Sequence, residues 1–224
     1  MKKPKHYRKL FDRWWLPKIY DLWVWIAVLG KTDNLRKNIL EFVPQNPAIL
    51  IDLATGTAEN ALYIKKRFPQ AQVLASDLSE GMITVAKKKA AKQKINIEFS
   101  LQDATHTSYE SHLADAVTIS FALHDLPGPK RKEVMKEAYR ILKPNGVFII
   151  YDYHLPKNWL VRIPLIIQFL LVENIDAWRM LKENLKEQLK EAGFTQPQRR
   201  GAGFTQTKQT THYRGLAQVV AGIK

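Results

Sequence analysis

The chain has 224 residues, of which 46% are hydrophobic and 25% charged, and it has a formal net charge of +14 and no cysteine. This length suits one α/β core with appendages, and the composition excludes disordered and collagen-like chains. The lack of cysteine excludes disulfide frameworks, thiolate zinc sites and cysteine nucleophiles, and it fits a reducing compartment. We predict no metal site. With no cleavable signal and no uncharged apolar run of about 18 residues, we predict a cytoplasmic protein.

Basic residues gather at both ends of the chain. Residues 1–10 carry five lysines or arginines and no acid, and residues 192–224 again carry five and no acid. This clustering predicts a basic surface that faces an anionic partner, which could be a membrane, a nucleic acid or an acidic substrate. The alternative is that the charge only keeps the protein soluble.

Strand-like and helix-like segments alternate from residue 48 onward. We predict strands at 48–53, 72–76, 95–101, 114–123 and 147–153, and helices at 58–68, 79–92 and 129–142. This alternation predicts a doubly wound, mostly parallel sheet with right-handed crossovers. Ser79 is suited to cap a helix, Pro129 to lie in a first helical turn, and residues 143–146 to turn the chain.

The region after Tyr153 has a different pattern. It contains an apolar helix broken at Pro164, a charged amphipathic helix at 176–192, and two strands near 195–202 and 213–221. A final pair of strands predicts a hairpin that adds an antiparallel strand to the sheet. We therefore divide the chain into a basic, Trp-rich helical cap at 1–44 and a ligand-binding domain at 45–224, with a cap insertion at 155–192.

Polar residues follow the first three predicted strands. The segment 52–60 leaves a strand and opens a helix, and its small residues let the backbone approach a ligand. Asp77 ends the next strand about 20 residues later, where an acid can accept ribose hydroxyls, and Asp103 follows the third strand. The three strand ends face one crevice. NAD is the alternative ligand, but the three-glycine fingerprint is missing, so a nucleoside without a pyrophosphate fits better.

With these motifs the sequence resembles a class I S-adenosylmethionine (SAM)-dependent methyltransferase, and within that group the ubiquinone/menaquinone C-methyltransferase family. The resemblance covers roughly residues 45–155 and is carried by the segments 52–57, 77–82, 102–104 and 139–146, with weaker echoes at Phe11-Asp12 and Tyr20-Asp21. It implies SAM as the cofactor and a Rossmann-like fold of seven strands, the last of them antiparallel.

The resemblance also implies roles for individual residues. The loop 52–57 would hold the amino acid part of SAM, Asp77 the ribose, Met82 the adenine face and Asp103 the adenine amine. The predicted cofactor-binding residues are Asp52, Ala54, Thr55, Gly56, Thr57, Asp77, Leu78, Met82, Asp103, Ala104, Ser120 and Tyr20. Two features depart from the family pattern: Ala58 replaces a glycine, and the segment 121–127 stands where Gly-Leu-Arg-Asn is usual.

Methyl transfer is an in-line displacement in which the enzyme aligns the acceptor and disposes of a proton. Candidate bases lie after the fourth and fifth strands, near where the SAM methyl group should point: His124, Tyr151, Asp152, Tyr153 and His154. We predict that His124 accepts the proton, with His154 as the competing choice and Asp152 as the residue that orients either ring. The alternative is that these residues pack beneath the helical cap or form hydrogen bonds at helix ends.

Tryptophan and basic residues alternate near the beginning of the chain. Trp14, Trp15, Trp23 and Trp25 lie among lysines and arginines, and the apolar segment 159–172 has Arg162 as its one charge. This pattern is typical of interfacial anchors. We therefore predict peripheral binding to the inner face of an anionic membrane and a lipophilic acceptor, either quinol-like or a lipid headgroup. Covering the SAM pocket is the alternative role of these segments.

Two other functions are alternatives to this one. An RNA methyltransferase would use the basic surface, but without cysteine the covalent cytosine C5 mechanism is excluded, and residues 120–123 lack the motif for exocyclic amine methylation. A non-catalytic, SAM-binding membrane module is the third candidate. The sequence leaves the acceptor atom and the oligomeric state open.

Overall fold

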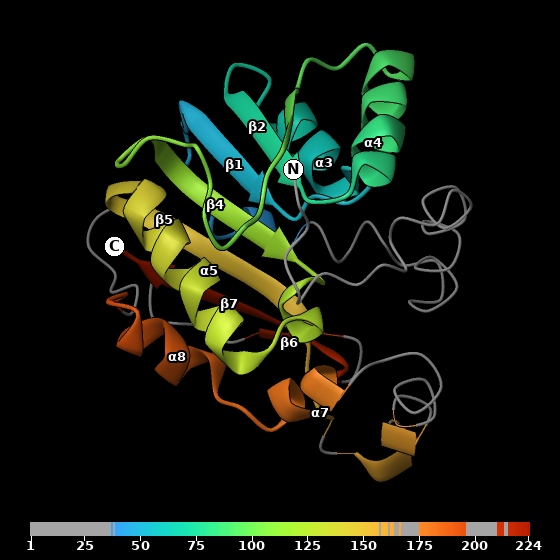
Figure 1. Ribbon diagram of the computed structural model, residues 1–224, viewed down its shortest axis with the longest axis vertical. Coiled ribbons are helices and arrows are strands. Elements are labelled where there is room, and N and C mark those ends of the chain that lie inside the picture. Colours follow the sequence, from blue (N-terminus) through green and yellow to red (C-terminus); the bar gives the residue numbers. More distant parts are fainter. Residues whose placement is uncertain are drawn as a thin grey trace.

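The computed structural model describes residues 37, 39–156, 158–160, 162–163, 166, 175–195, 210–212 and 215–224, so most of the predicted cap at 1–44 lies outside the described residues. Within this part, seven strands form one sheet (Figure 1), in the order β3-β2-β1-β4-β5-β7-β6. The strands are β1 Ile49–Leu53, β2 Gln72–Asp77, β3 Glu98–Leu101, β4 Ala114–Ser120, β5 Leu142–Tyr153, β6 Thr210–His212 and β7 Ala217–Ile223. The helical elements are α3 Glu59–Arg67, α4 Glu80–Lys92, the 3-10 turn η2 Leu123–Asp125, α5 Gly128–Ile141, α7 Ile175–Leu181 and α8 Leu185–Glu191.

The pairing confirms the predicted fold class. Strands β1 to β5 pair in parallel, and β7 pairs antiparallel with both β5 and β6. The chain runs outward from β1 to β3 and then returns to place β4 beside β1, so the strand order reverses between β1 and β4. Open α/β sheets bind ligands beyond the carboxyl ends of the strands at such a switch point.

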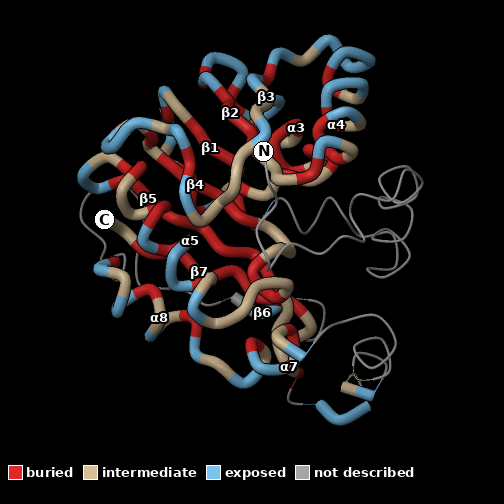
Figure 2. The backbone as a smooth tube through the Cα atoms, in the orientation of Figure 1, coloured by how far each residue is buried: buried red, intermediate tan, exposed pale blue. Residues whose placement is uncertain are grey.

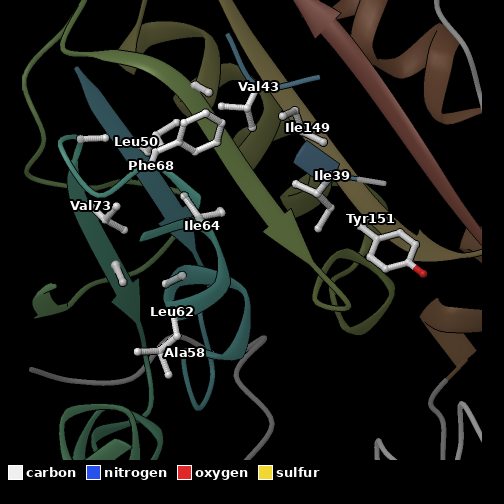
Figure 3. Close-up of a cluster of buried hydrophobic side chains, with 14 of the residues drawn as sticks. Ile39, Val43, Leu50, Ala58, Leu62, Ile64, Phe68, Val73, Ile149 and Tyr151 are labelled. Carbon is white, nitrogen blue, oxygen red and sulfur yellow. The ribbon is translucent and has the colours of Figure 1, made fainter. Parts of the chain in front are cut away.

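Two apolar layers hold the helices to the sheet. One includes Leu50, Val73 and Ile149 from the sheet with Ile64 of α3 (Figure 3), and the other includes Ile51 and Phe148 with residues of α5 and α8. Neighbouring strand residues such as Leu50 and Ile51 belong to different layers because side chains alternate across a strand. Figure 2 shows the central strands as the most continuously buried part of the molecule.

Local capping chemistry sets several helix ends as predicted. The hydroxyl of Ser79 accepts a hydrogen bond from the Met82 amide at 3.3 Å, which satisfies one of the free amides at the beginning of α4. Pro129 lies in the first turn of α5, where its missing amide hydrogen is not needed. None of the helices in the described residues is long and apolar enough to cross a membrane.

Two predicted boundaries are wrong. The helix ends before 143–146 and Asn145 turns with a φ of 65°, as predicted, but this turn is a bulge inside β5, which begins at Leu142: Ala114 pairs with Leu142 and Ala116 with Val147. The single helix predicted at 176–192 is two helices, α7 and α8. The Asn184 side chain accepts a hydrogen bond from the Lys186 amide at 3.1 Å and so begins a new helix.

The C-terminal antiparallel strand is confirmed, with shifted bounds. Of the strand predicted near 195–202, Thr195 forms an isolated bridge with Ile223, and residues 196–202 lie outside the described part. The strand predicted at 213–221 is observed as β7, which lies between β5 and β6 and pairs with both. The last strands therefore close the β5 edge of the sheet.

Candidate active site

A buried polar network organises the loop after β1. The carboxylate of Asp52 accepts hydrogen bonds from the Thr55 hydroxyl at 2.6 Å, the Asn60 side-chain amide at 2.8 Å and the Thr118 hydroxyl. Burial raises the pKa of Asp52, while these three hydrogen bonds oppose that rise. The observed contacts of Asp52 thus fix the shape of the loop. Sequence reasoning included Asn60 in the segment 52–60 without a role and did not identify Thr118, although Thr118 is a polar residue in an otherwise apolar strand.

The same loop has an unusual backbone conformation. Ala54, Gly56 and Ala58 have φ angles of 50°, 56° and 64°, all in the left-handed region. For alanine this region costs on the order of 1–2 kcal/mol, because the Cβ atom approaches the carbonyl oxygen. Ala58, which departs from the expected glycine, therefore keeps the conformation that glycine would adopt. The loop therefore has a strained backbone, which is common in loops that bind ligands.

Asp77 joins this loop to the end of β2. Its two carboxylate oxygens accept hydrogen bonds from the backbone amides of Gly56 and Ser79, both at 2.8 Å. Burial raises the pKa of Asp77, and the nearby charge of Asp52 adds to that rise. The residue is nevertheless partly exposed, and each carboxylate oxygen has a second lone pair for a ligand.

The other predicted cofactor residues lie around the same edge of the sheet, with one exception. Thr57 and Met82 are buried, while Leu78, Asp103 and Ala104 are partly exposed. The Asp103 carboxylate accepts hydrogen bonds from the amide and the hydroxyl of Thr105, both at 2.9 Å. Tyr20 lies outside the described residues. At the end of β4 the hydroxyl of Ser120 is buried and has no hydrogen-bond partner among the described residues, so a ligand group could bind there.

A histidine and an aspartate from neighbouring strand ends form a buried pair. His124 in η2 places Nδ1 2.7 Å from Oδ1 of Asp152, and the other oxygen of Asp152 accepts the amides of Leu123 at 3.0 Å and His124 at 3.3 Å. A carboxylate in contact with Nδ1 favours the ring tautomer that carries its hydrogen there, and in that tautomer Nε2 is the atom that can accept a proton. The Asp125 carboxylate lies 3.7 Å from Nε2, so both ring nitrogens have an acid nearby.

A cluster of aromatic rings contacts this pair through Tyr153. Phe121 packs edge-on against Tyr151 and Tyr153, with ring centroids 4.9 and 5.2 Å apart, and the His124 ring packs edge-on against Tyr153 at 4.8 Å. Phe121 also has a φ of 48°, which is rare for a bulky residue. Sequence reasoning did not identify Phe121. A strained aromatic residue at the switch point gives the site an apolar wall suited to a ring-shaped acceptor.

His154, the competing candidate base, is held elsewhere. Its Nδ1 lies 2.8 Å from the carbonyl oxygen of Gly215, and its backbone amide donates to the Leu216 carbonyl. The structure therefore brings Asp152 to His124 and ties His154 to the segment before β7. Among the residues that the structure describes, no group of three histidine, aspartate or glutamate side chains could hold a metal ion.

A buried arginine fixes the turn that carries His124. Arg131 of α5 is fully buried and donates to the carbonyl oxygen of Leu126, which directly follows η2. It also donates to the Asp176 carbonyl oxygen of α7 and forms an ion pair with Glu183. Sequence reasoning did not identify Arg131, although its position three and four residues before Val134 and Met135 places it on the apolar face of its helix.

The chain is similar to several known methyltransferases. Residues 50–146 match a family model described as a methyltransferase domain. A demethylmenaquinone methyltransferase from Thermotoga maritima is 32% identical over 70% of this chain and 65% of that protein, so the match spans slightly less than two thirds of the relative. The demethylmenaquinone methyltransferase of Deinococcus radiodurans is 27% identical over 91% of this chain and 86% of that protein. A SAM-dependent methyltransferase structure from Aquifex aeolicus has a TM-score of 0.61 at 18% identity, covering 84% of this chain and 88% of that one, and shares the fold.

Proposed function

We propose, on the premise that the chain belongs to the class I SAM-dependent methyltransferases, that it methylates a lipophilic, quinol-like acceptor. The relatives from Thermotoga maritima and Deinococcus radiodurans are demethylmenaquinone methyltransferases, which supports a quinol as the acceptor class. The observation that carries the proposal is the His124–Asp152 pair beside an aromatic wall, at the strand switch point and next to the loop that fits SAM.

The residues at the carboxyl edge of the sheet fit the chemistry of SAM. This cofactor has a positive sulfonium and a positive ammonium group, and aspartates gather at this edge although the chain as a whole is strongly basic. We assign the methionine part to the loop 52–57, the ribose to Asp77 and the adenine to the neighbourhood of Met82 and Asp103. Negative charge at this edge favours the cationic cofactor over its neutral demethylated product.

The chain's own contribution to the reaction is to orient the acceptor and accept its proton. When bound, SAM supplies an electrophilic methyl carbon, and its sulfur keeps the electron pair of the broken bond. Nε2 of His124 accepts the proton that the acceptor loses as its new bond forms. Asp152 holds the ring in the required tautomer, and together with Asp125 it stabilises the resulting imidazolium charge.

Transfer of isotopic label tests the proposed function. The protein is incubated with methyl-labelled SAM and, in separate reactions, with a reduced naphthoquinone lacking its ring methyl group, a lipid extract and total RNA. We expect label in the naphthoquinol and in the quinone fraction of the lipid extract. Label in RNA, or label in none of the three samples while SAM still binds, would contradict the proposal.

Substitution of Asp77 tests the cofactor site. We expect Asp77→Ala to weaken SAM binding by about 1.5–3 kcal/mol, or roughly 10- to 150-fold, because a charge-assisted hydrogen bond to ribose is lost. Asp77→Asn keeps one acceptor oxygen for the Gly56 amide and should lose less. Burial raises the pKa of Asp77, so as the pH is lowered this carboxylate should become protonated at a higher pH than an ordinary aspartate. The SAM affinity of the wild type should fall with that protonation, and the affinity of Asp77→Asn should not.

Titration calorimetry measures these affinities, with NAD as a ligand that should not bind. Glu80→Ala is the matched control, because it removes an exposed acid from the neighbouring helix and leaves the contacts of Asp77 intact. Unchanged SAM affinity in Asp77→Ala, or an equal loss in Glu80→Ala, would remove Asp77 from the site.

A further inference from the structure

Most of the strongly exposed apolar side chains lie in one region of the described structure. Trp159, Leu160, Ile163 and Ile175 are 65%, 59%, 45% and 65% exposed, and Leu101 on β3 is the fifth large apolar side chain of this kind among the described residues. Scattered exposed apolar residues are normal, but several of them close together in the sequence mark an interaction surface. We call Trp159, Leu160 and Ile163 the apolar turn.

Hydrogen bonds hold the beginning of the apolar turn close to the end of β5. The Asn158 side chain accepts a hydrogen bond from the Leu160 amide at 2.9 Å, and the Asn158 carbonyl oxygen accepts one from the Arg162 amide. Nε of Arg162 donates to the carbonyl oxygen of Pro156 at 3.0 Å, which ties the turn to the chain that leaves β5. Trp159 and Ile163 are four residues apart and share one helical face. Figure 2 shows this exposed piece at the lower right.

The apolar turn and the proposed acceptor site both follow the carboxyl ends of strands, at the same edge of the sheet. It follows the carboxyl end of β5, where Asp152 and Tyr153 contact His124. Helix α7, which presents Ile175, packs through Ala177 against Tyr153 and Leu155 and also contacts η2. Exposed apolar side chains thus belong to the helix that contacts η2 and to the segment that follows the end of β5.

Charge indicates what this surface meets. Residues 153–172 contain Lys157 and Arg162 and no acid, within a chain of net charge +14. Exposed tryptophan and aliphatic side chains beside basic residues suit the headgroup region of an anionic bilayer. Nucleic acid would also suit the charge, but it offers no apolar environment for Leu160 and Ile163. The combination of apolar and basic side chains therefore favours a lipid surface.

We propose that the apolar turn inserts into an anionic membrane surface and brings the mouth of the active site to the lipid from which the acceptor comes. This inference rests on the proposed function, because a lipophilic acceptor dissolved in the bilayer could then enter the site without crossing water. Membrane attachment through this surface would make turnover of a bilayer-embedded acceptor depend on residues that take no part in the chemistry.

Binding of the full chain to vesicles tests the surface independently of catalysis. The vesicles are phosphatidylcholine with about one third phosphatidylglycerol, an anionic lipid that adds electrostatic attraction. We expect Trp159→Gln combined with Leu160→Gln to lower the partition coefficient roughly 10- to 100-fold, because apolar area no longer leaves water. The single variant Ile163→Gln should have a smaller effect of the same sign. The matched control is Leu101→Gln, which removes an exposed leucine from β3 and should bind within about twofold of wild type.

A second measurement separates this inference from the methyl transfer itself. The double variant should methylate a water-soluble, short-tailed naphthoquinol at the wild-type rate and lose turnover only with a long-tailed one embedded in vesicles. Unchanged vesicle binding in the double variant, an equal loss in Leu101→Gln, no vesicle binding by wild type, or tighter binding to RNA at the same salt would each overturn the membrane surface. Failure to methylate either quinol would instead contradict the proposed function.

Discussion

His124→Asn should lower kcat about 100- to 10,000-fold, the usual contribution of a general base, while SAM affinity and melting temperature change little. Asparagine is chosen because its side-chain amide can donate to Asp152 much as Nδ1 does, whereas nothing replaces the basic Nε2 atom. Asp152→Asn should also reduce kcat, because a neutral partner no longer holds the tautomer or stabilises the imidazolium. We expect its pH–rate profile to shift, which a purely structural role would not produce.

The measurement is turnover of a short-tailed naphthoquinol at saturating SAM, alongside calorimetry and thermal melting of each variant. His154→Asn is the matched comparison, since that ring contacts the Gly215 carbonyl oxygen instead of Asp152. We expect it to stay within about threefold of wild type, well below a general-base contribution. A His124→Asn protein that binds SAM, melts normally and also turns over within threefold would remove His124 as the base.

The fold could be predicted because its central strands are buried on both faces. Such strands are nearly continuous apolar runs, and the runs at 48–53, 114–123 and 147–153 alternate with helical patterns. What could not be predicted is that a turn lies inside a strand as a bulge. Pro144, Asn145 and Gly146 are typical turn residues, yet the Asn145 amide donates to the Lys224 carbonyl oxygen and the segment remains in β5.

The candidate site could be predicted in outline but not in its pairings. Residues at the carboxyl ends of parallel strands must share one edge, so Asp77, His124 and Asp152 could be placed together from the strand order alone. Whether Asp152 contacts His124 or His154 depends on register and on the path of η2, which local sequence does not encode. The pairing of Ser120 with Tyr151 sets the ends of β4 and β5 level and so brings His124 to Asp152.

Buried polar networks are the least predictable part of the site. Asn60 ends the segment 52–60, but Thr118 meets it on Asp52 from a distant strand and belongs to no short motif. Arg131 lies in a run of lysines and arginines that looks like a solvated helix face. Its helical phase, in step with Val134 and Ala138, was the available signal, because a charged residue on an apolar face must be paired.

Replacing Arg131 should strongly destabilise the fold. Its guanidinium is fully buried and joins α5 to the Leu126 carbonyl after η2, to the Asp176 carbonyl of α7 and to the Glu183 carboxylate before α8. Arg131→Ala removes the donor to the carbonyl oxygens of Leu126 and Asp176 and leaves a cavity, while the Glu183 carboxylate keeps its hydrogen bond from the Gln188 side chain. Breaking a fully buried ion pair from one side typically costs about 3–5 kcal/mol, and because the Glu183 side chain is 30% exposed we expect the lower end of that range.

At this chain length a loss of about 3 kcal/mol corresponds to a fall in melting temperature of roughly 6–12 °C. Arg131→Met should lose less, because the apolar side chain fills much of the volume and buries no charge. Lys130→Ala is the matched control: its ion pair with Glu133 is exposed, so its removal should cost no more than about 0.5 kcal/mol.

Arg131 holds the chain that follows η2, so we also expect Arg131→Ala to lose turnover. The variant should still bind SAM, because the proposed SAM site lies at β1 and β2. Melting curves for Arg131→Ala and Lys130→Ala that coincide would show that the buried pair does not stabilise the fold.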